Sequence, residues 1–144
     1  MLREATLADM PELVRMGRAF HAAAKLDIEF DDSTFRDLCA QLIEADGALL
    51  LIDDGAMLAA LCFPIYFNAS ALVAQELFWW VDPDKRGAGI RLLQRAEQWA
   101  KEKGAVTLQM IALDELSGES VGRLYERRGY RPLERSYVRN LNGH

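Results

Sequence analysis

The chain of 144 residues has few of the features that mark secreted, metal-binding or membrane proteins. Its two cysteines, Cys39 and Cys62, form neither a disulfide framework nor a metal-ligand spacing, so we expect reduced thiols, no metal centre and a cytoplasmic location. The longest uncharged run, residues 56–74, is interrupted by Pro64 and by polar residues. No basic stretch followed by an apolar segment opens the sequence. The sequence therefore predicts neither a transmembrane span nor a signal peptide.

The chain also lacks internal repeats, low-complexity linkers and any excess of basic charge. Its net charge of -5 argues against a nucleic-acid partner. The charge is uneven, because residues 1–83 carry many more acidic than basic side chains and residues 84–144 carry more basic ones. This asymmetry suggests an anion site in the second half. With 51% hydrophobic residues, the length suits one domain with its own core over residues 1–144.

Apolar periodicity and turn residues predict a mixed α/β order of elements. Strands are expected at residues 2–6, 48–52, 57–67, 72–81 and 106–113, and one or two more at 130–141. A turn is expected at residues 68–70. Helices are expected from the cap Asp9 to about His21, from Asp32 or Ser33 to before Gly47, from Gly87 to Lys103, and from Ser117 or Ser120 to before Gly129. The helix at 87–103 would connect two parallel, neighbouring strands by a right-handed crossover.

The most informative segment lies at the turn between the strand at 72–81 and the helix that follows. Gly87 and Gly89 stand at this turn, with Lys85, Arg86 and Arg91 around them. Free N–H groups at a helix start, its dipole and adjacent glycines together favour an anionic ligand such as a phosphate. A P-loop is excluded because Gly-Lys followed by Ser or Thr is missing, and a dinucleotide fingerprint is excluded because residue 92 is leucine.

Three motifs resemble those of the GNAT N-acetyltransferase superfamily. They are the loop Arg86-Gly87-Ala88-Gly89-Ile90-Arg91, the opening segment LREATLADMPEL and the segment LYERRGY at residues 124–130. Two positions depart from the family pattern: Arg91 replaces a small residue, and Gly118 replaces a frequent asparagine. The resemblance implies a mostly antiparallel sheet with one splayed parallel strand pair, flanked by about four helices.

The resemblance also implies a cofactor and a reaction. Acetyl-CoA would lay its pyrophosphate on the amides of residues 86–91, and its pantetheine arm along Trp79, Trp80 and Val81. The implied reaction is direct transfer of the acetyl group to a primary amine of a small molecule or a peptide. Arg91 would either crowd the pyrophosphate or add an ionic contact to it, and we favour the contact.

Two residues are candidates for the proton transfers of that reaction. Tyr125 matches the family tyrosine that serves as general acid, and the alternative is a tyrosine packed in the core. Glu76, the only acidic residue between Asp54 and Asp82, is a candidate general base. Its alternative is a solvent-facing strand residue, with a water chain in place of a side-chain base.

Substrate and partners stay open at this stage. A cluster of acidic residues between the first two helices would attract a cationic amine, although a solvated loop that caps a helix explains it more simply: Asp27, Glu29, Asp31 and Asp32. A homodimer is compatible with the resemblance. Two alternatives share the scaffold: a catalytically silent member that binds acyl-CoA or a protein partner, and an enzyme that transfers a longer acyl chain.

Overall fold

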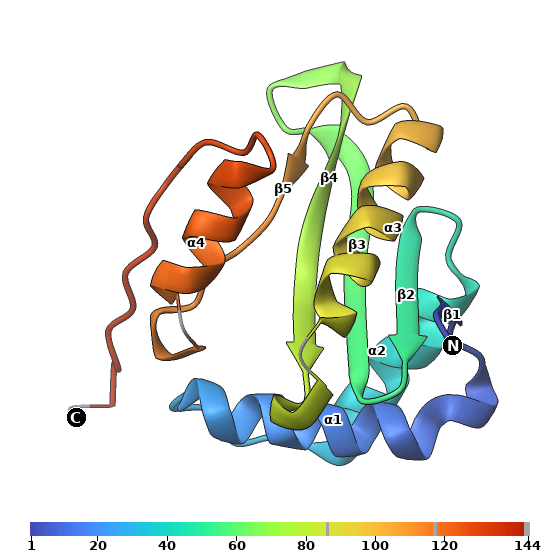
Figure 1. The fold of residues 1–144 in the computed structure, drawn as a ribbon, viewed down its shortest axis with the longest axis vertical. Helices are drawn as coiled ribbons and strands as arrows, with labels where there is room; N and C mark the ends of the chain where they lie inside the picture. The colour runs from blue at the N-terminus through green and yellow to red at the C-terminus, as the bar shows by residue number, and fades with distance from the viewer. Residues whose placement is uncertain (86, 117, 143–144) are drawn as a thin grey trace.

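The computed structural model describes residues 1–85, 87–116 and 118–142 and shows a five-stranded sheet covered by helices (Figure 1). The strands are β1 (Arg3–Glu4), β2 (Ala48–Asp53), β3 (Ala56–Ile65), β4 (Asn68–Val81) and β5 (Leu108–Gln109). The helices are α1 (Met10–Ala24), α2 (Asp32–Glu44), α3 (Ala88–Glu102) and α4 (Gly118–Arg127). Three 3-10 turns complete the described elements: η1 (Leu7–Asp9), η2 (Pro83–Lys85) and η3 (Asp114–Leu116).

The sheet order is β1-β2-β3-β4-β5, and every pair is antiparallel except β4 and β5. This arrangement confirms the predicted mixed sheet with one parallel pair. The chain leaves β4, passes through α3 and returns as β5, its parallel neighbour, as predicted for a strand–helix–strand unit. Figure 1 shows α4 on the far side of β5 from the rest of the sheet.

Each face of the sheet has its own apolar core. Helices α1 and α2 cover one face, with Leu13, Met16 and Cys39 fully buried. Helix α3 covers the other face through a stripe that includes Leu92 and Ala96, which have no exposed surface. Each buried side chain of the size of leucine contributes about 1.5–3 kcal/mol to the stability of the fold. Strand β4 contributes side chains to both cores.

A β-bulge in β4 changes which side chains face which core. Ala59 pairs with Phe78 and Ala60 pairs with Glu76, so Leu77 has no partner of its own. Side chains alternate along a regular strand, and an inserted residue reverses that alternation. Ala74 before the bulge and Trp79 after it therefore both face α3.

Several predicted boundaries differ from the structure. The strand expected at 106–113 pairs only at Leu108–Gln109, because β5 separates from β4 after that point. The turn expected at 68–70 was wrong: β3 ends at Ile65, and β4 begins at Asn68. Helix α1 continues to Ala24, and the cap of α2 is Asp31, whose carboxylate accepts from the Thr34 amide at 3.0 Å. Ser117, one of the two predicted starts of α4, lies outside the described residues.

The strands expected at 130–141 are absent from the part of this segment that the structure describes. Residues 130–140 have no regular secondary structure, and the side chains of 131–139 are exposed. Pro132 cannot donate to a strand ladder, and Arg135 interrupts the apolar alternation. None of the described helices is both long enough and apolar enough to cross a membrane.

Candidate active site

The start of α3 presents backbone amides that no side chain caps. Gly87 occupies the N-cap with a φ of 101°, a left-handed conformation that favours glycine. A Cβ on Gly89 would lie 3.1 Å from Val81 Cγ2 and 3.2 Å from Trp79 Cζ2, so this turn packs tightly against β4. The first four N–H groups of any helix lack partners within it. Gly87, Ala88, Gly89 and Ile90 thus form the expected loop and helix start, whereas Arg86 lies outside the described residues.

Basic side chains next to this turn are paired with carboxylates. Arg91 donates to Asp53 at 3.2 Å, and Lys85 donates to Asp54 at 2.9 Å. Asp53 is 7% exposed. Burial alone would raise the pKa of Asp53, but hydrogen bonds from the Asp54 amide, the Met1 amino group and Arg91 lower it. Arg91 is therefore held toward β2 in this structure.

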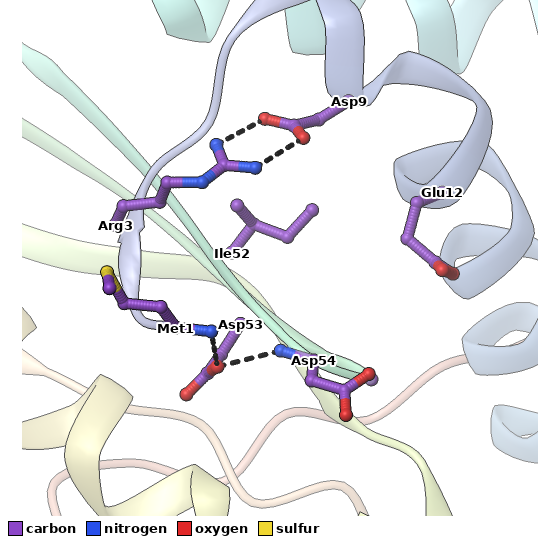
Figure 2. Close-up of a pocket in the computed structure, with 8 residues that line it drawn as sticks. Met1, Arg3, Asp9, Glu12, Ile52, Asp53 and Asp54 are labelled. Atoms are coloured by element: carbon purple, nitrogen blue, oxygen red, sulfur yellow. Dashed lines mark hydrogen bonds and ion pairs between the residues drawn. The ribbon is translucent and has the colours of Figure 1, made fainter.

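Two surface hollows lie near these ion pairs. One, of about 420 Å³, is lined by Asp84, Lys85, Gly87, Ala88 and Arg91 together with Asp53 and Asp54. The other, of about 270 Å³, lies at the edge of the sheet by β1 (Figure 2). Arg3 donates two hydrogen bonds to Asp9, at 2.7 and 2.8 Å, and both are drawn in Figure 2. Glu76 and Tyr125 line neither hollow.

The two predicted proton-transfer residues meet where β4 and β5 part. The last parallel pair is Gln75 with Gln109, and Glu76 is the next residue of β4. Glu76 is 6% exposed, and its Oε1 accepts a hydrogen bond from the Ile111 amide at 2.9 Å. The Tyr125 hydroxyl, on α4, donates to the Ile111 carbonyl at 2.8 Å. Both side chains therefore bond to the backbone of Ile111, which the sequence did not single out.

The surroundings of this pair shift both pKa values upward. Burial raises the pKa of Glu76 to about 7, although the hydrogen bond from the Ile111 amide lowers it in part. Burial, and then the negative charge of Glu76, raise the pKa of Tyr125. Near neutral pH, Glu76 is thus able to take or release a proton, while Tyr125 stays protonated and is able to donate a hydrogen bond.

The adjacent tryptophans of β4 point to opposite faces, as a strand dictates. Trp80 lies in the core of α1 and α2, stacks on Phe20 at 6.0 Å between ring centroids, and donates to Asp82 at 2.8 Å. Trp79 faces α3 and α4 and lies 6.1 Å from the Tyr125 ring. The structure therefore brings Trp79 together with Tyr125, and directs the Trp80 side chain away from them.

Two of the four acidic residues predicted between the first two helices have structural partners. Asp31 caps α2, and Asp32 pairs with Arg18, in line with the simpler explanation of the acidic loop. Gly118 stands where a Cβ would lie 3.0 Å from the Leu113 carbonyl, which accounts for glycine in place of asparagine. Within the ranges that the structure describes, no three His, Cys, Asp or Glu side chains gather to hold a metal ion.

Solved structures share this fold over nearly the whole chain. A predicted acetyltransferase with acetyl-CoA from Clostridium acetobutylicum matches with a TM-score of 0.76 at 19% identity, covering 100% of this chain and 97% of that one. An aminoglycoside 6'-N-acetyltransferase from Acinetobacter haemolyticus matches with a TM-score of 0.71 at 19% identity, covering 97% of both chains. A ribosomal-protein-alanine N-acetyltransferase from Brucella melitensis biovar Abortus 2308 gives 0.71 at 20%, covering 98% of both chains.

These identities establish the fold alone, and a search of the curated proteins gives no match. The sequence itself carries the family assignment. A sequence model of the acetyltransferase (GNAT) family matches residues 11–130, which include the helix-start loop, Glu76 and Tyr125. The chain is therefore a member of the acetyltransferase (GNAT) family.

Proposed function

We propose that this protein transfers an acetyl group from acetyl-CoA directly to a primary amine, with Glu76 as general base and Tyr125 as hydrogen-bond donor to the leaving sulfur. The observation that carries the proposal is the buried Glu76, with a pKa of about 7, within the parting of β4 and β5 and close to Tyr125. A carboxylate with such a pKa is half deprotonated near neutral pH, which suits a general base.

The residues at the start of α3 fit the anionic end of acetyl-CoA. The uncapped amides of residues 87–90 and the helix dipole favour phosphate, and glycine at 89 keeps the turn close to β4. Lys85 and Arg91 add positive charge beside this turn, although both now pair with carboxylates. An anion here would compete with Asp54 and Asp53 for them. When bound, acetyl-CoA would supply an activated acetyl group as a thioester.

Glu76 would make the acceptor amine nucleophilic. A C–N bond forms as the thioester C–S bond breaks, and the amine gives up a proton in the process. Glu76 would take that proton directly or through one water. Its carboxylate accepts from the Ile111 amide at the point where the pairing of β4 and β5 ends. The Ile111 amide steadies the deprotonated form, which keeps the carboxylate in one orientation.

Tyr125 would serve the leaving sulfur. Its raised pKa means that it remains a hydroxyl, so it donates a hydrogen bond and does not act as a base. A hydroxyl has one proton, which in this structure goes to the Ile111 carbonyl. Donation to sulfur therefore requires the O–H to turn away from Ile111, a rotation about a single bond. The thiolate would then take a proton from solvent and leave as free thiol, while Glu76 returns the proton of the amine to solvent.

For the acceptor we propose a small-molecule or peptide amine. The aminoglycoside and ribosomal-protein-alanine acetyltransferases share the fold and differ in acceptor, so the scaffold does not choose between these classes. Asp27 and Glu29 are exposed in the segment between α1 and α2, where their charge would attract a cationic acceptor. We further propose that the chain acts in the cytoplasm as one domain.

A second candidate is a member of the family that binds acyl-CoA without turnover. One observation favours it: Glu76 and Tyr125 both bond to the Ile111 backbone, as two residues that only secure the segment after β5 would do. In that case the two side chains contribute stability and no chemistry.

Thioester turnover separates the two functions. Purified protein is mixed with acetyl-CoA and a panel of amines that includes aminoglycosides, polyamines and peptides, and released thiol is measured against a blank without amine. The enzyme proposal predicts amine-dependent thiol release, with the acetylated amine found by mass spectrometry. Binding of acetyl-CoA without thiol release above the blank for any amine would favour the silent member.

A further inference from the structure

Trp79 has a buried hydrogen-bond donor with no partner. Its indole Nε1 is closed off from solvent and has no acceptor among the described residues, although other parts of the side chain reach the surface. Its neighbour Trp80 shows the usual outcome, because that indole donates to Asp82 at 2.8 Å. Buried N–H groups in native proteins nearly always have a partner, so an exception calls for an explanation.

The position of Trp79 points to that explanation. The ring lies between Gly89, at the start of α3, and Tyr125, on α4. It follows the bulge at Leu77 that turns it toward α3, and it comes three residues after Glu76, where β4 loses its pairing with β5. The ring that carries the unpaired donor therefore neighbours both the turn at the start of α3 and the ring of Tyr125.

A cofactor that reaches from the start of α3 to Tyr125 would run beside this indole. The proposed acetyl-CoA carries amide carbonyls along its pantetheine arm and a thioester carbonyl at its end, and each is a hydrogen-bond acceptor. We infer that the Trp79 indole N–H donates a hydrogen bond to a carbonyl oxygen of bound acetyl-CoA. This inference rests on the proposed function. It assigns a hydrogen bond to the Trp79 side chain, whereas the family resemblance implies only that the pantetheine arm runs along this part of β4.

The unpaired donor favours ligand binding for an energetic reason. In the free protein the N–H has already lost its water, so the ligand carbonyl gains a hydrogen bond without a further desolvation cost on the protein side. Because the N–H is buried in the free protein, the carbonyl reaches it only when the atoms that cover it move aside.

The test is the indole N–H signal of Trp79 in a ¹⁵N–¹H NMR spectrum. The chain has three tryptophans, so the spectrum of labelled protein contains three indole signals, which Trp79→Phe, Trp80→Phe and Trp99→Phe assign. We expect the Trp79 signal to move downfield on addition of acetyl-CoA and its proton to exchange slowly with water. The Trp80 signal, whose donor is already bonded, is the internal control and stays in place.

Free CoA is the second arm of the experiment. A downfield shift with both CoA and acetyl-CoA assigns the acceptor to a pantetheine amide, and a shift with acetyl-CoA alone assigns it to the thioester. Titration calorimetry on the same samples gives the affinities, and Trp79→Phe should bind acetyl-CoA about tenfold more weakly, as expected for one hydrogen bond. Trp99→Phe, which changes a core side chain of α3 outside the proposed site, should bind as wild type does.

Two results would overturn the inference. If calorimetry shows that wild type binds acetyl-CoA while the Trp79 signal stays in place or moves to the position of a solvent-exposed indole, the indole does not bond to the cofactor and the proposed function survives. If wild type binds neither acetyl-CoA nor CoA, both the inference and the proposed function fail.

Discussion

Replacing Glu76 by glutamine should make the protein more stable at alkaline pH while it removes activity. Glutamine has the shape of the protonated acid, remains neutral, and keeps an oxygen to accept from the Ile111 amide, which lies 2.9 Å from the native carboxylate. Wild type must hold a buried negative charge at that place once Glu76 deprotonates. The variant never carries that charge.

The magnitude follows from the pKa of Glu76. Burial raises this pKa from an ordinary 4.5 to about 7. A group whose pKa is raised on folding stabilises the folded state fully below its unfolded pKa, and this contribution is lost as pH rises through the folded pKa. This rise in the pKa corresponds to about 3 kcal/mol of stability, lost between about pH 4.5 and pH 7. Glu76→Gln should therefore exceed wild type in stability by up to about 3 kcal/mol at pH 8, and by much less at pH 5.

Urea unfolding of both proteins at pH 5 and pH 8 measures this difference. Other titrating groups contribute equally to both proteins, so the change in the difference between the two pH values isolates Glu76. Glu126→Gln, which removes an exposed carboxylate from α4 beside Tyr125, is the matched control and should follow wild type at both pH values. Activity should fall at least about 100-fold in Glu76→Gln. In wild type, kcat/KM should rise with increasing pH, with an apparent pKa of about 7.

The reasoning would be refuted by a Glu76→Gln protein that is less stable than wild type at pH 8, or by one whose stability difference from wild type is the same at both pH values. Either result would mean that the carboxylate is not held in a desolvated place. Full activity in Glu76→Gln, together with the expected stability difference, would mean that a water chain and not Glu76 takes the proton.

Three further perturbations test other parts of the structure. Gly89→Ala should weaken acetyl-CoA binding at least about tenfold, because the new methyl group meets β4 at 3.1 Å. The control Gly122→Ala has nothing within 4 Å of the new methyl group, so its stability should rise by up to about 1 kcal/mol and its affinity for acetyl-CoA should stay unchanged. Equal affinities of the two variants would contradict the tight turn. Tyr125→Phe loses the bond to the Ile111 carbonyl and should lower stability by about 1–2 kcal/mol and kcat by more than affinity; an unchanged kcat would leave it a packing role only. A chain that ends at Tyr130 should unfold within about 1 kcal/mol of the full chain, because residues 131–139 are exposed, and a larger loss would show that they pack.

Much of the fold could be predicted because strong local signals agree with the tertiary structure. The apolar stripe that contains Leu92 and Ala96 predicts a buried helix face, and the two residues indeed have no exposed surface. Asp54-Gly55 predicts a tight hairpin, and Gly55 has the expected positive φ of 72°. The parallel pairing of β4 and β5 was predicted from the strand–helix–strand order of the segment.

The errors come from places where local propensity does not decide the structure. Residues 130–141 have strand-forming side chains, but a strand also needs a partner edge, and periodicity says nothing about that. The bulge at Leu77 leaves no sequence signal, yet it sets the face on which Trp79 lies. The Ile111 backbone was missed for a simpler reason: a main-chain group at the site has no distinctive residue type.

Candidate side chains were easier to find than their surroundings. Glu76 is visible as an isolated carboxylate in an apolar strand, and Tyr125 within its motif. The sequence left open whether Glu76 faces solvent, and the structure places it in a buried position. Arg91 was expected near a phosphate, while in the structure it bonds to Asp53, a long-range pair that no local pattern reports.

Isothermal titration of the wild-type protein with acetyl-CoA, and separately with free CoA, tests the central claim most directly. The uncapped start of α3 and the glycine at 89 predict saturable binding of both, with micromolar dissociation constants. Folded protein that shows no binding of either ligand would contradict the account. The helix start would then hold no cofactor, and the roles given to Glu76 and Tyr125 would have no reaction to serve.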